Sequence, residues 1–316
     1  MKISFLDVGS LGPGLDLNRF SRWGDLESWD NSVGDERIEH LASSTVAVAN
    51  RVIFDKAVFS ACPQLRLILL TATGYNNVDL DEARRRGVAV CNVVGYSTES
   101  VAQHTLALLL ALMEQTSWLD AYGKTQWAGT TTFGQFARPF HEIFGKSWGI
   151  VGLGRIGWRV AELAQAFGAQ VSYYSSQGAD RGALPRVDLP TLLKTSDILS
   201  IHSPLNDQTR NLICAAELAL MKPTAYLVNV GRGGIVDEAA LAQALDGGTL
   251  AGAALDVTLP EPPLAANPLL SLQHPQRLVL SPHVAWASIE SRERCLAEVE
   301  ANLWSWLQGE RRNRVD

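Results

Sequence analysis

The 316-residue sequence lacks the features of several classes of protein. It holds no run of about 18 consecutive apolar residues, the length of a membrane-spanning helix, and its first residues lack the apolar core and cleavage site of a secretion signal. No block of Lys and Arg exceeds three residues and the net charge is −6, so the basic stripe of a nucleic-acid-binding protein is missing. We therefore expect a protein that binds neither membranes nor nucleic acids.

Cysteine is also scarce: the four cysteines are widely separated, and no Cys-x-x-Cys pair is present. The six histidines form no cluster at metal-ligand spacing. These absences predict that the protein has no metal site and keeps its thiols reduced, as in a cytoplasmic location.

The composition is that of a folded protein, because 47% of the residues are hydrophobic and only 19% are charged. The length corresponds to about two domains. Short apolar runs of strand length alternate with helical stretches, a pattern typical of βα units and parallel sheets. The runs expected to form strands are 2–6, 46–49, 67–70 and 88–90 in a first series, and 148–151, 171–174, 198–201, 225–228, 252–255 and 278–280 in a second.

The two series predict two α/β domains. We expect the first to comprise residues 1–97 and 289–316, and the second to comprise residues 98–288, inserted between these segments. A helix over 101–113 is apolar nearly all round and should be buried. The amphipathic final helix, 289–307, is expected to return to the first domain.

Residues 115–142 differ from the rest of the second domain. They hold five Trp and Phe side chains among Gly, Thr and Gln, and such a stretch does not pack as one regular element. We interpret it as an arm that packs on another subunit, which predicts a homodimer.

A glycine motif opens the second series. The strand ending at Val151 runs into the pattern Gly-x-Gly-x-x-Gly, with a helical stretch after it. The first glycine permits the tight turn, the second lets a pyrophosphate approach the backbone, and the third lets helix and strand pack closely. A dinucleotide-binding fold has six parallel strands joined by helical crossovers, which is the number expected in this series. The cofactor-binding residues predicted here are Gly152, Gly154, Arg155, Ile156 and Gly157.

The choice between NAD and NADP depends on the end of the next strand. NAD sites place Asp or Glu there to bind the ribose 2′-hydroxyl. This sequence instead has Ser175 and Ser176, and Arg181 follows close enough to reach a 2′-phosphate. The pattern favours NADP or use of both cofactors, while Asp180 or backbone groups leave NAD open.

Several motifs together resemble the D-2-hydroxyacid dehydrogenase family, most closely its glycerate dehydrogenase or hydroxypyruvate (glyoxylate) reductase branch. Their order and spacing match over nearly the whole chain. The resemblance implies a Rossmann-type dinucleotide-binding domain inserted in a flavodoxin-like substrate domain. It also implies NAD(P)-dependent reduction of small 2-ketoacids such as hydroxypyruvate and glyoxylate. The matching stretches are 152–157, 202–205, 229–238, 254–257, 261–262 and 282–283, and for the branch 73–79, 95–104 and 283–288.

The resemblance further implies a catalytic trio of Arg232, Glu261 and His283. Hydride reduction of a ketone needs a proton donor, and a histidine with a near-neutral pKa suits that role. A carboxylate beside the imidazole would orient it, and a guanidinium would bind the substrate carboxylate and polarise the carbonyl. Each residue alone also has an ordinary explanation. His283 could be a structural histidine, Glu261 a solvated turn residue, and Arg232 the ion-pair partner of any acidic side chain.

The remaining site assignments rest on resemblance or, for Asn50, Arg51 and Trp286, on position after a strand or after His283. The loop at Thr73 and Gly74 would bind the substrate carboxylate through backbone N–H groups. Asn50 and Arg51 would line the same cleft, and Trp286 would cover the pocket or pack in the core. The other residues assigned to the cofactor are His202, Ser203, Pro204, Thr209, Val230, Gly231, Asp256 and Ala285. Of these, His202 is either structural or adjacent to the cofactor, and Asp256 supports either the nicotinamide end or the histidine network. His104, within an apolar helix, is expected to be an ordinary core histidine.

Three other functions fit parts of the sequence. A 3-phosphoglycerate dehydrogenase would need extra basic residues for its substrate phosphate, and many carry a further C-terminal domain. Formate dehydrogenases of this superfamily have Gln at the position of Glu261, so Glu261 argues against that activity. A non-catalytic dinucleotide sensor resembling the C-terminal-binding co-repressors keeps the trio, so slow turnover alongside tight cofactor binding would distinguish it.

Overall fold

The computed structural model describes residues 1–178 and 182–316. Asp180 and Arg181, which bear on the cofactor prediction, lie outside the described residues. The chain forms two compact units, one of residues 1–97 and 287–316 and one of residues 98–286.

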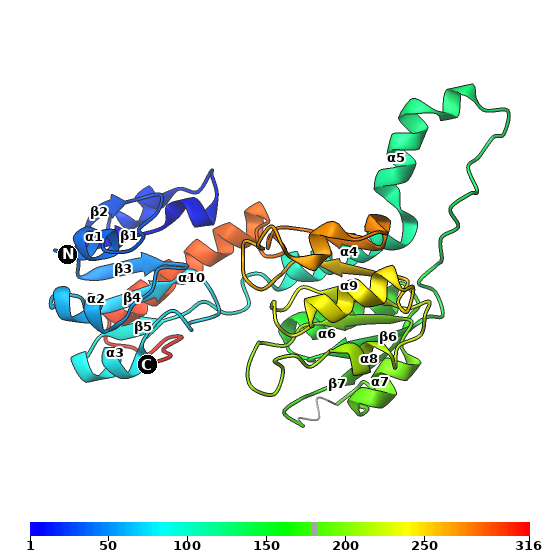
Figure 1. Ribbon diagram of the computed structural model, residues 1–316. Helices are drawn as coiled ribbons and strands as arrows, with labels where there is room; N and C mark the ends of the chain where they lie inside the picture. Colours follow the sequence, from blue (N-terminus) through cyan, green and yellow to red (C-terminus); the bar gives the residue numbers. More distant parts are fainter. Residues whose placement is uncertain (179–181) are drawn as a thin grey trace. The chain divides into compact units, whose positions relative to one another are not determined.

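The first unit is a five-stranded parallel sheet in the order β2-β1-β3-β4-β5 (Figure 1). This is the flavodoxin-like order. Strand β2 was not predicted, because this edge strand is polar and mostly exposed and so shows no apolar run. The strands are β1 (Lys2–Phe5), β2 (Asp25–Ser28), β3 (Val46–Ala49), β4 (Leu67–Leu70) and β5 (Ala89–Cys91).

Helices in this unit are α1 (Glu36–Leu41), α2 (Lys56–Ala61), α3 (Leu80–Arg86) and α10 (Ile289–Leu307). Short 3₁₀ turns are η1 (Val8–Leu11) and η2 (Leu17–Phe20). The final helix α10 has the predicted bounds and belongs to this unit, where it packs against β4. Its buried Cys295 thiol donates to the carbonyl of Thr71, just beyond the end of β4, at 3.4 Å.

The second unit is a six-stranded parallel sheet in the order β11-β10-β9-β8-β6-β7. Beyond β7, the bridge between Tyr173 and Arg186 takes the place of one more strand. With this bridge counted third, the order becomes the Rossmann order 3-2-1-4-5-6 with one further strand at the far edge. The strands are β6 (Ser147–Val151), β7 (Gln170–Tyr174), β8 (Ile198–Ile201), β9 (Tyr226–Asn229), β10 (Gly252–Leu255) and β11 (Leu278–Leu280).

Helices of the second unit are α4 (Thr98–Glu114), α5 (Thr116–Thr125), α6 (Arg155–Ala166), α7 (Leu189–Thr195), α8 (Ala215–Leu218) and α9 (Glu238–Asp246). The 3₁₀ turns are η3 (Trp127–Gly129), η4 (Pro268–Ser271) and η5 (Pro275–Arg277). As its apolar sequence predicts, α4 is largely buried, and it packs against α6 and β10. Among the described residues, no helix has both the length and the apolarity needed to cross a bilayer.

The segment 115–142 is only partly regular. Its first part forms α5, which Figure 1 shows extending away from the sheet of this unit, and none of the side chains of α5 is buried. The following aromatic side chains are exposed: Phe133 by 88%, Phe136 by 72% and Phe140 by 55%. The unit's own core therefore does not cover this segment.

Candidate active site

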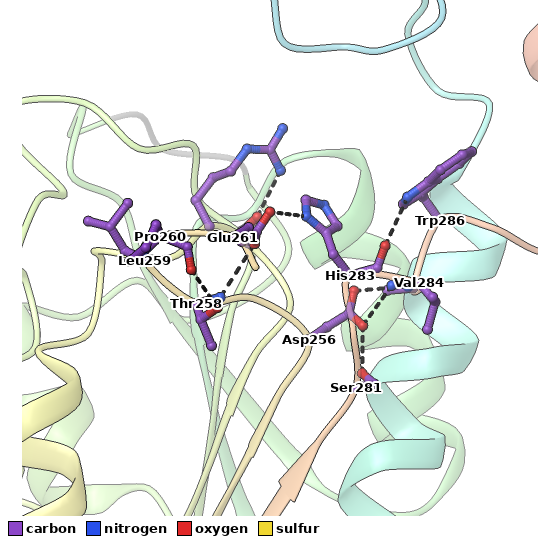
Figure 2. A network of polar contacts seen from close by, with 12 residues as sticks. Asp256, Thr258, Leu259, Pro260, Glu261, Ser281, His283, Val284 and Trp286 are labelled. Atoms are coloured by element: carbon purple, nitrogen blue, oxygen red, sulfur yellow. Dashed lines mark hydrogen bonds and ion pairs between the residues drawn. The ribbon is translucent and has the colours of Figure 1, made fainter. Parts of the chain in front are cut away.

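The loops that follow β10 and β11 bring His283 and Glu261 together. His283 Nδ1 lies 2.6 Å from Glu261 Oε2, and Figure 2 shows the imidazole and the carboxylate facing each other. A carboxylate only accepts hydrogen bonds, so Nδ1 carries hydrogen and Nε2 is the ring atom left to exchange a proton. The His283 side chain is 34% exposed, so a small molecule can reach it.

The backbone at His283 is held by Asp256, which directly follows β10. The Asp256 carboxylate accepts from the Val284 N–H at 2.9 Å and from Ser281 Oγ at 2.5 Å (Figure 2). It also accepts from the Ala285 N–H at 2.9 Å. Its carbonyl accepts from the His283 N–H at 2.9 Å. The side chain is only 1% exposed, so these three donors replace the water that a buried charge needs.

His104 is not the enclosed core histidine that its apolar helix predicts. Its side chain is 27% exposed, and its Nε2 lies 3.1 Å from Ser281 Oγ and 3.6 Å from Asp256 Oδ1. A polar group on α4 thus reaches the network beneath His283. The sequence offered no pattern for this contact, since His104 and Ser281 are 177 residues apart.

Arg232 lies in the loop after β9 and is exposed, with Nη1 donating to the Gly231 carbonyl at 2.8 Å. The loop is fixed by Asn229, which the sequence analysis did not single out. The buried Asn229 amide donates to the carbonyl of Arg232 and accepts from the Gly231 N–H, both at 3.0 Å. Next in the chain, a Cβ on Gly233 would lie 2.0 Å from the Thr258 carbonyl oxygen, so only glycine fits there.

The glycine motif fits a dinucleotide pyrophosphate. A Cβ on Gly152 would lie 2.4 Å from Ser203 Oγ, and one on Gly157 would lie 2.2 Å from the Gly152 carbonyl oxygen. In contrast, a Cβ on Gly154 would meet nothing within 4 Å. Gly154 is also the residue before α6, whose first N–H groups receive no side-chain cap. Open space thus lies beside free N–H groups, as an anion site requires.

The turn after β8 packs against this motif. Ser203 Oγ donates to the Val151 carbonyl at 3.2 Å, and His202 Nε2 lies 3.0 Å from Ser200 Oγ. Burial lowers the pKa of His202 to about 3, so its imidazole is neutral at physiological pH. Thr209, assigned to the cofactor by resemblance, is fully buried, and its hydroxyl donates to the Pro204 carbonyl at 2.6 Å inside the turn.

Ser175 and Ser176 follow β7 and are half-buried. Arg186, which the sequence analysis did not consider, forms the extra bridge of the sheet and is exposed. Its guanidinium lies 3.6 Å from where a Cβ on Gly178 would stand. A cation is therefore present beside the loop that begins at Ser175. The signal that could have identified it is its place in the shortened third strand.

In the first unit, Asp7 positions two of the predicted substrate residues. Its carboxylate accepts from the backbone N–H groups of Asn50 at 2.9 Å and Arg51 at 2.7 Å. Burial raises the pKa of Asp7, against these hydrogen bonds, which lower it. The Thr73 hydroxyl donates to the Val93 carbonyl at 2.8 Å. It thereby fixes the loop that also contains Gly74.

The remaining predicted residues are mostly buried. Val230 and Ala285 are 8% and 3% exposed. Trp286 is half-buried against the core of the second unit, and its Nε1 donates to the His283 carbonyl at 3.1 Å. Within the residues 1–178 and 182–316, no three His, Cys, Asp or Glu side chains are grouped as metal ligands would be.

Comparison with known proteins identifies relatives that are 2-hydroxyacid dehydrogenases and reductases. Residues 106–285 match the family described as D-isomer specific 2-hydroxyacid dehydrogenase, NAD binding domain. Glycerate dehydrogenase of Methylorubrum extorquens is 34% identical over 100% of this chain and 99% of its own length. Glyoxylate reductase of Aeropyrum pernix is 39% identical over 93% of this chain and 90% of its own.

A solved structure with a similar fold is the acyclic imino acid reductase Bsp5 in complex with NADPH and D-Arg. It is 30% identical, with a TM-score of 0.88 over 100% of both chains. The match and this structure support a nicotinamide dinucleotide as the cofactor.

Two alanine substitutions should separate the glycines of the cofactor motif. Gly157→Ala places a methyl group against the Gly152 carbonyl and should cost about 1–3 kcal/mol of unfolding free energy. Gly154→Ala fills open space at an ordinary φ of −81° and should leave Tm nearly unchanged. It should still weaken NADH and NADPH binding more than about tenfold, because the methyl group occupies the pyrophosphate position. Calorimetry and fluorescence titration measure the two effects, and wild-type affinity in Gly154→Ala would contradict the assignment.

Proposed function

The chain belongs to the D-isomer specific 2-hydroxyacid dehydrogenase family, and on this premise we propose that it reduces small 2-ketoacids to D-2-hydroxyacids with NADPH or NADH. Hydroxypyruvate and glyoxylate are the proposed substrates. The observation that carries the proposal is the 2.6 Å pair of His283 and Glu261. The names of the relatives, glycerate dehydrogenase and glyoxylate reductase, support the substrate class.

The proposed mechanism assigns a role to each member of the trio. The nicotinamide group, when bound, supplies the hydride. His283 gives the proton on Nε2 to the carbonyl oxygen, and Glu261 orients the ring and stabilises its protonated form. Arg232 binds the substrate carboxylate with its planar guanidinium and polarises the carbonyl. The exposed position of Arg232 at the end of β9 suits contact with a ligand.

The substrate contacts proposed in the first unit come from loops that follow its strands. Thr73, Gly74, Asn50 and Arg51 all follow strands of one parallel sheet, at its carboxyl edge, where α/β proteins bind ligands. The cytoplasmic location inferred from the scattered cysteines stays a prediction, as does a direct cofactor contact of Asp256.

The first prediction concerns turnover and the trio. The wild-type enzyme should oxidise NADPH or NADH with hydroxypyruvate and glyoxylate. His283→Ala should lower kcat about 10²–10⁴-fold, because the proton donor is lost, while Kd for the cofactor stays within about twofold. Arg232→Ala should raise KM for the 2-ketoacid about 10–100-fold, because a charge-assisted contact is lost. The turnover rates of the wild-type enzyme and both variants are measured from the loss of NADPH or NADH absorbance.

His274→Ala, at a half-buried histidine in the same unit, is the matched control and should behave as wild type. Full activity of His283→Ala would contradict the proton-donor role. Activity only with bulky phenyl 2-ketoacids would keep the family and refute the substrates. Tight cofactor binding without turnover of any 2-ketoacid would favour a dinucleotide sensor.

We propose that the enzyme prefers NADPH or uses both cofactors. No acidic side chain occupies positions 175–178, and the Arg186 guanidinium stands beside that loop. Serine hydroxyls do not repel a 2′-phosphate, and a guanidinium attracts it. Ser175→Asp should therefore lower the NADPH-to-NADH ratio of kcat/KM more than about tenfold through like-charge repulsion.

The same cofactor assay tests Arg186. Arg186→Ala should raise KM for NADPH about tenfold and leave KM for NADH within about twofold, because only NADPH carries the phosphate. Arg210→Ala, at an exposed arginine of the same unit, should change neither value. An unchanged NADPH-to-NADH ratio in both Ser175→Asp and Arg186→Ala would refute this cofactor argument.

We also propose that the protein is a homodimer joined through residues 115–142. Exposed aromatic side chains are enriched where proteins associate, and α5 buries none of its own. Sedimentation should give a dimer at micromolar concentration. Replacing Phe133 and Phe136 with Asp should shift the protein to monomer, whereas Val33→Asp, at an exposed apolar residue of the first unit, should not. A monomeric wild-type protein would refute the proposal.

A further inference from the structure

We propose that His104 is a positioning residue for the proton donor: through Ser281 and Asp256 it holds the backbone at His283–Ala285 in place. This inference rests on the proposed role of His283. The contacts form one line, from His104 Nε2 to Ser281 Oγ at 3.1 Å, then to Asp256 Oδ1 at 2.5 Å. From Asp256 the line ends on the N–H groups of Val284 and Ala285, each at 2.9 Å.

The direction of each hydrogen bond follows from the chemistry of the groups. The 2.5 Å separation between Ser281 Oγ and the Asp256 carboxylate is that of a charge-assisted bond, and a carboxylate can only accept. Ser281 therefore donates its one hydrogen to Asp256. Its oxygen is then left to accept, so His104 donates from Nε2–H. The line assigns His104 the tautomer with hydrogen on Nε2, and every donor in it points toward the carboxylate.

The loop needs such support, because His283 has a φ of +53°. A residue with a Cβ in the left-handed region is held there only by its surroundings. The Asp256 carboxylate and carbonyl supply three backbone contacts, to His283, Val284 and Ala285. Ser281 sets the orientation of Asp256 by donating to its carboxylate. His104 in turn fixes the Ser281 hydroxyl by donating to its oxygen.

Helix α4 provides the rigid base of this arrangement. Ser100 lies one turn before His104, so the two side chains share a face of the helix. Ser100 Oγ donates to the Ala285 carbonyl at 2.6 Å, while His104 reaches Ser281. The helix thus holds both ends of the segment that contains His283. Because α4 spans 17 residues and is largely buried, it gives the loop a fixed reference.

The test compares His104→Leu, which keeps bulk and removes the donor, with His104→Gln, whose amide N–H can reach the same position. Gln103→Ala, on the exposed neighbour, is the matched control. His104→Leu should lower kcat about tenfold or more, as expected for a displaced catalytic group, with cofactor Kd and KM nearly unchanged. His104→Gln should recover most of kcat, and the control should equal wild type.

Hydrogen exchange gives a readout that does not depend on activity. In the free protein, amides of the peptide that contains Val284 and Ala285 should exchange about fivefold faster in His104→Leu, and at the wild-type rate in His104→Gln. Ser281→Ala should have the same effect as His104→Leu. Adding His104→Leu to Ser281→Ala should then change kcat and exchange less than twofold, because both substitutions break one line of contacts.

Unchanged exchange in His104→Leu would overturn the proposal, as would additive effects of the two substitutions. Faster exchange with wild-type kcat would also overturn it, because the loop would then be held without consequence for the reaction. Failure of the proposed function is distinguishable: a wild-type protein that reduces no 2-ketoacid refutes that function, while the exchange comparison still decides whether His104 anchors the loop.

Discussion

The arrangement of the candidate site depends on one buried carboxylate. Asp256 is 1% exposed, and a charge in that position is tolerated only because Ser281 and two backbone N–H groups bind it. The same contacts that stabilise the charge determine the path of the loop, so the cost of burying Asp256 is offset by groups that also orient His283. An apolar side chain in place of Asp256 would leave the N–H groups of Val284 and Ala285 without their acceptor.

Most of the fold could be predicted because buried parallel strands are continuous apolar runs. The runs at 46–49 and 67–70 became β3 and β4 with the same bounds, and the final helix was found at 289–307. The edge strand β2 escaped prediction because its polar side chains face solvent and show no period. The third strand of the second sheet is a single bridge at Arg186, too short for any pattern of hydrophobicity.

The sequence predicts the residues of the candidate site only where they belong to a recognisable motif. The glycines at 152, 154 and 157 were predicted from the motif. The structure shows a steric reason at Gly152 and Gly157, whereas a Cβ on Gly154 would meet only open space. His283 and Glu261 were paired by resemblance, and the structure places their side chains in contact. His104 and Asp7 bind groups that lie 177 and 43 residues away in the chain, and no sequence pattern identifies such partners. A hydrogen bond between residues 177 positions apart exists only once the helices and strands are packed.

The exposed helix α5 has a thermodynamic consequence for the whole protein. A helix of ten residues is marginal in water, and α5 has no buried side chain in its own unit to stabilise it. In the proposed dimer, burial against the second subunit stabilises this helix. Folding of this segment and subunit pairing would then be one equilibrium, and the apparent melting temperature would rise with protein concentration.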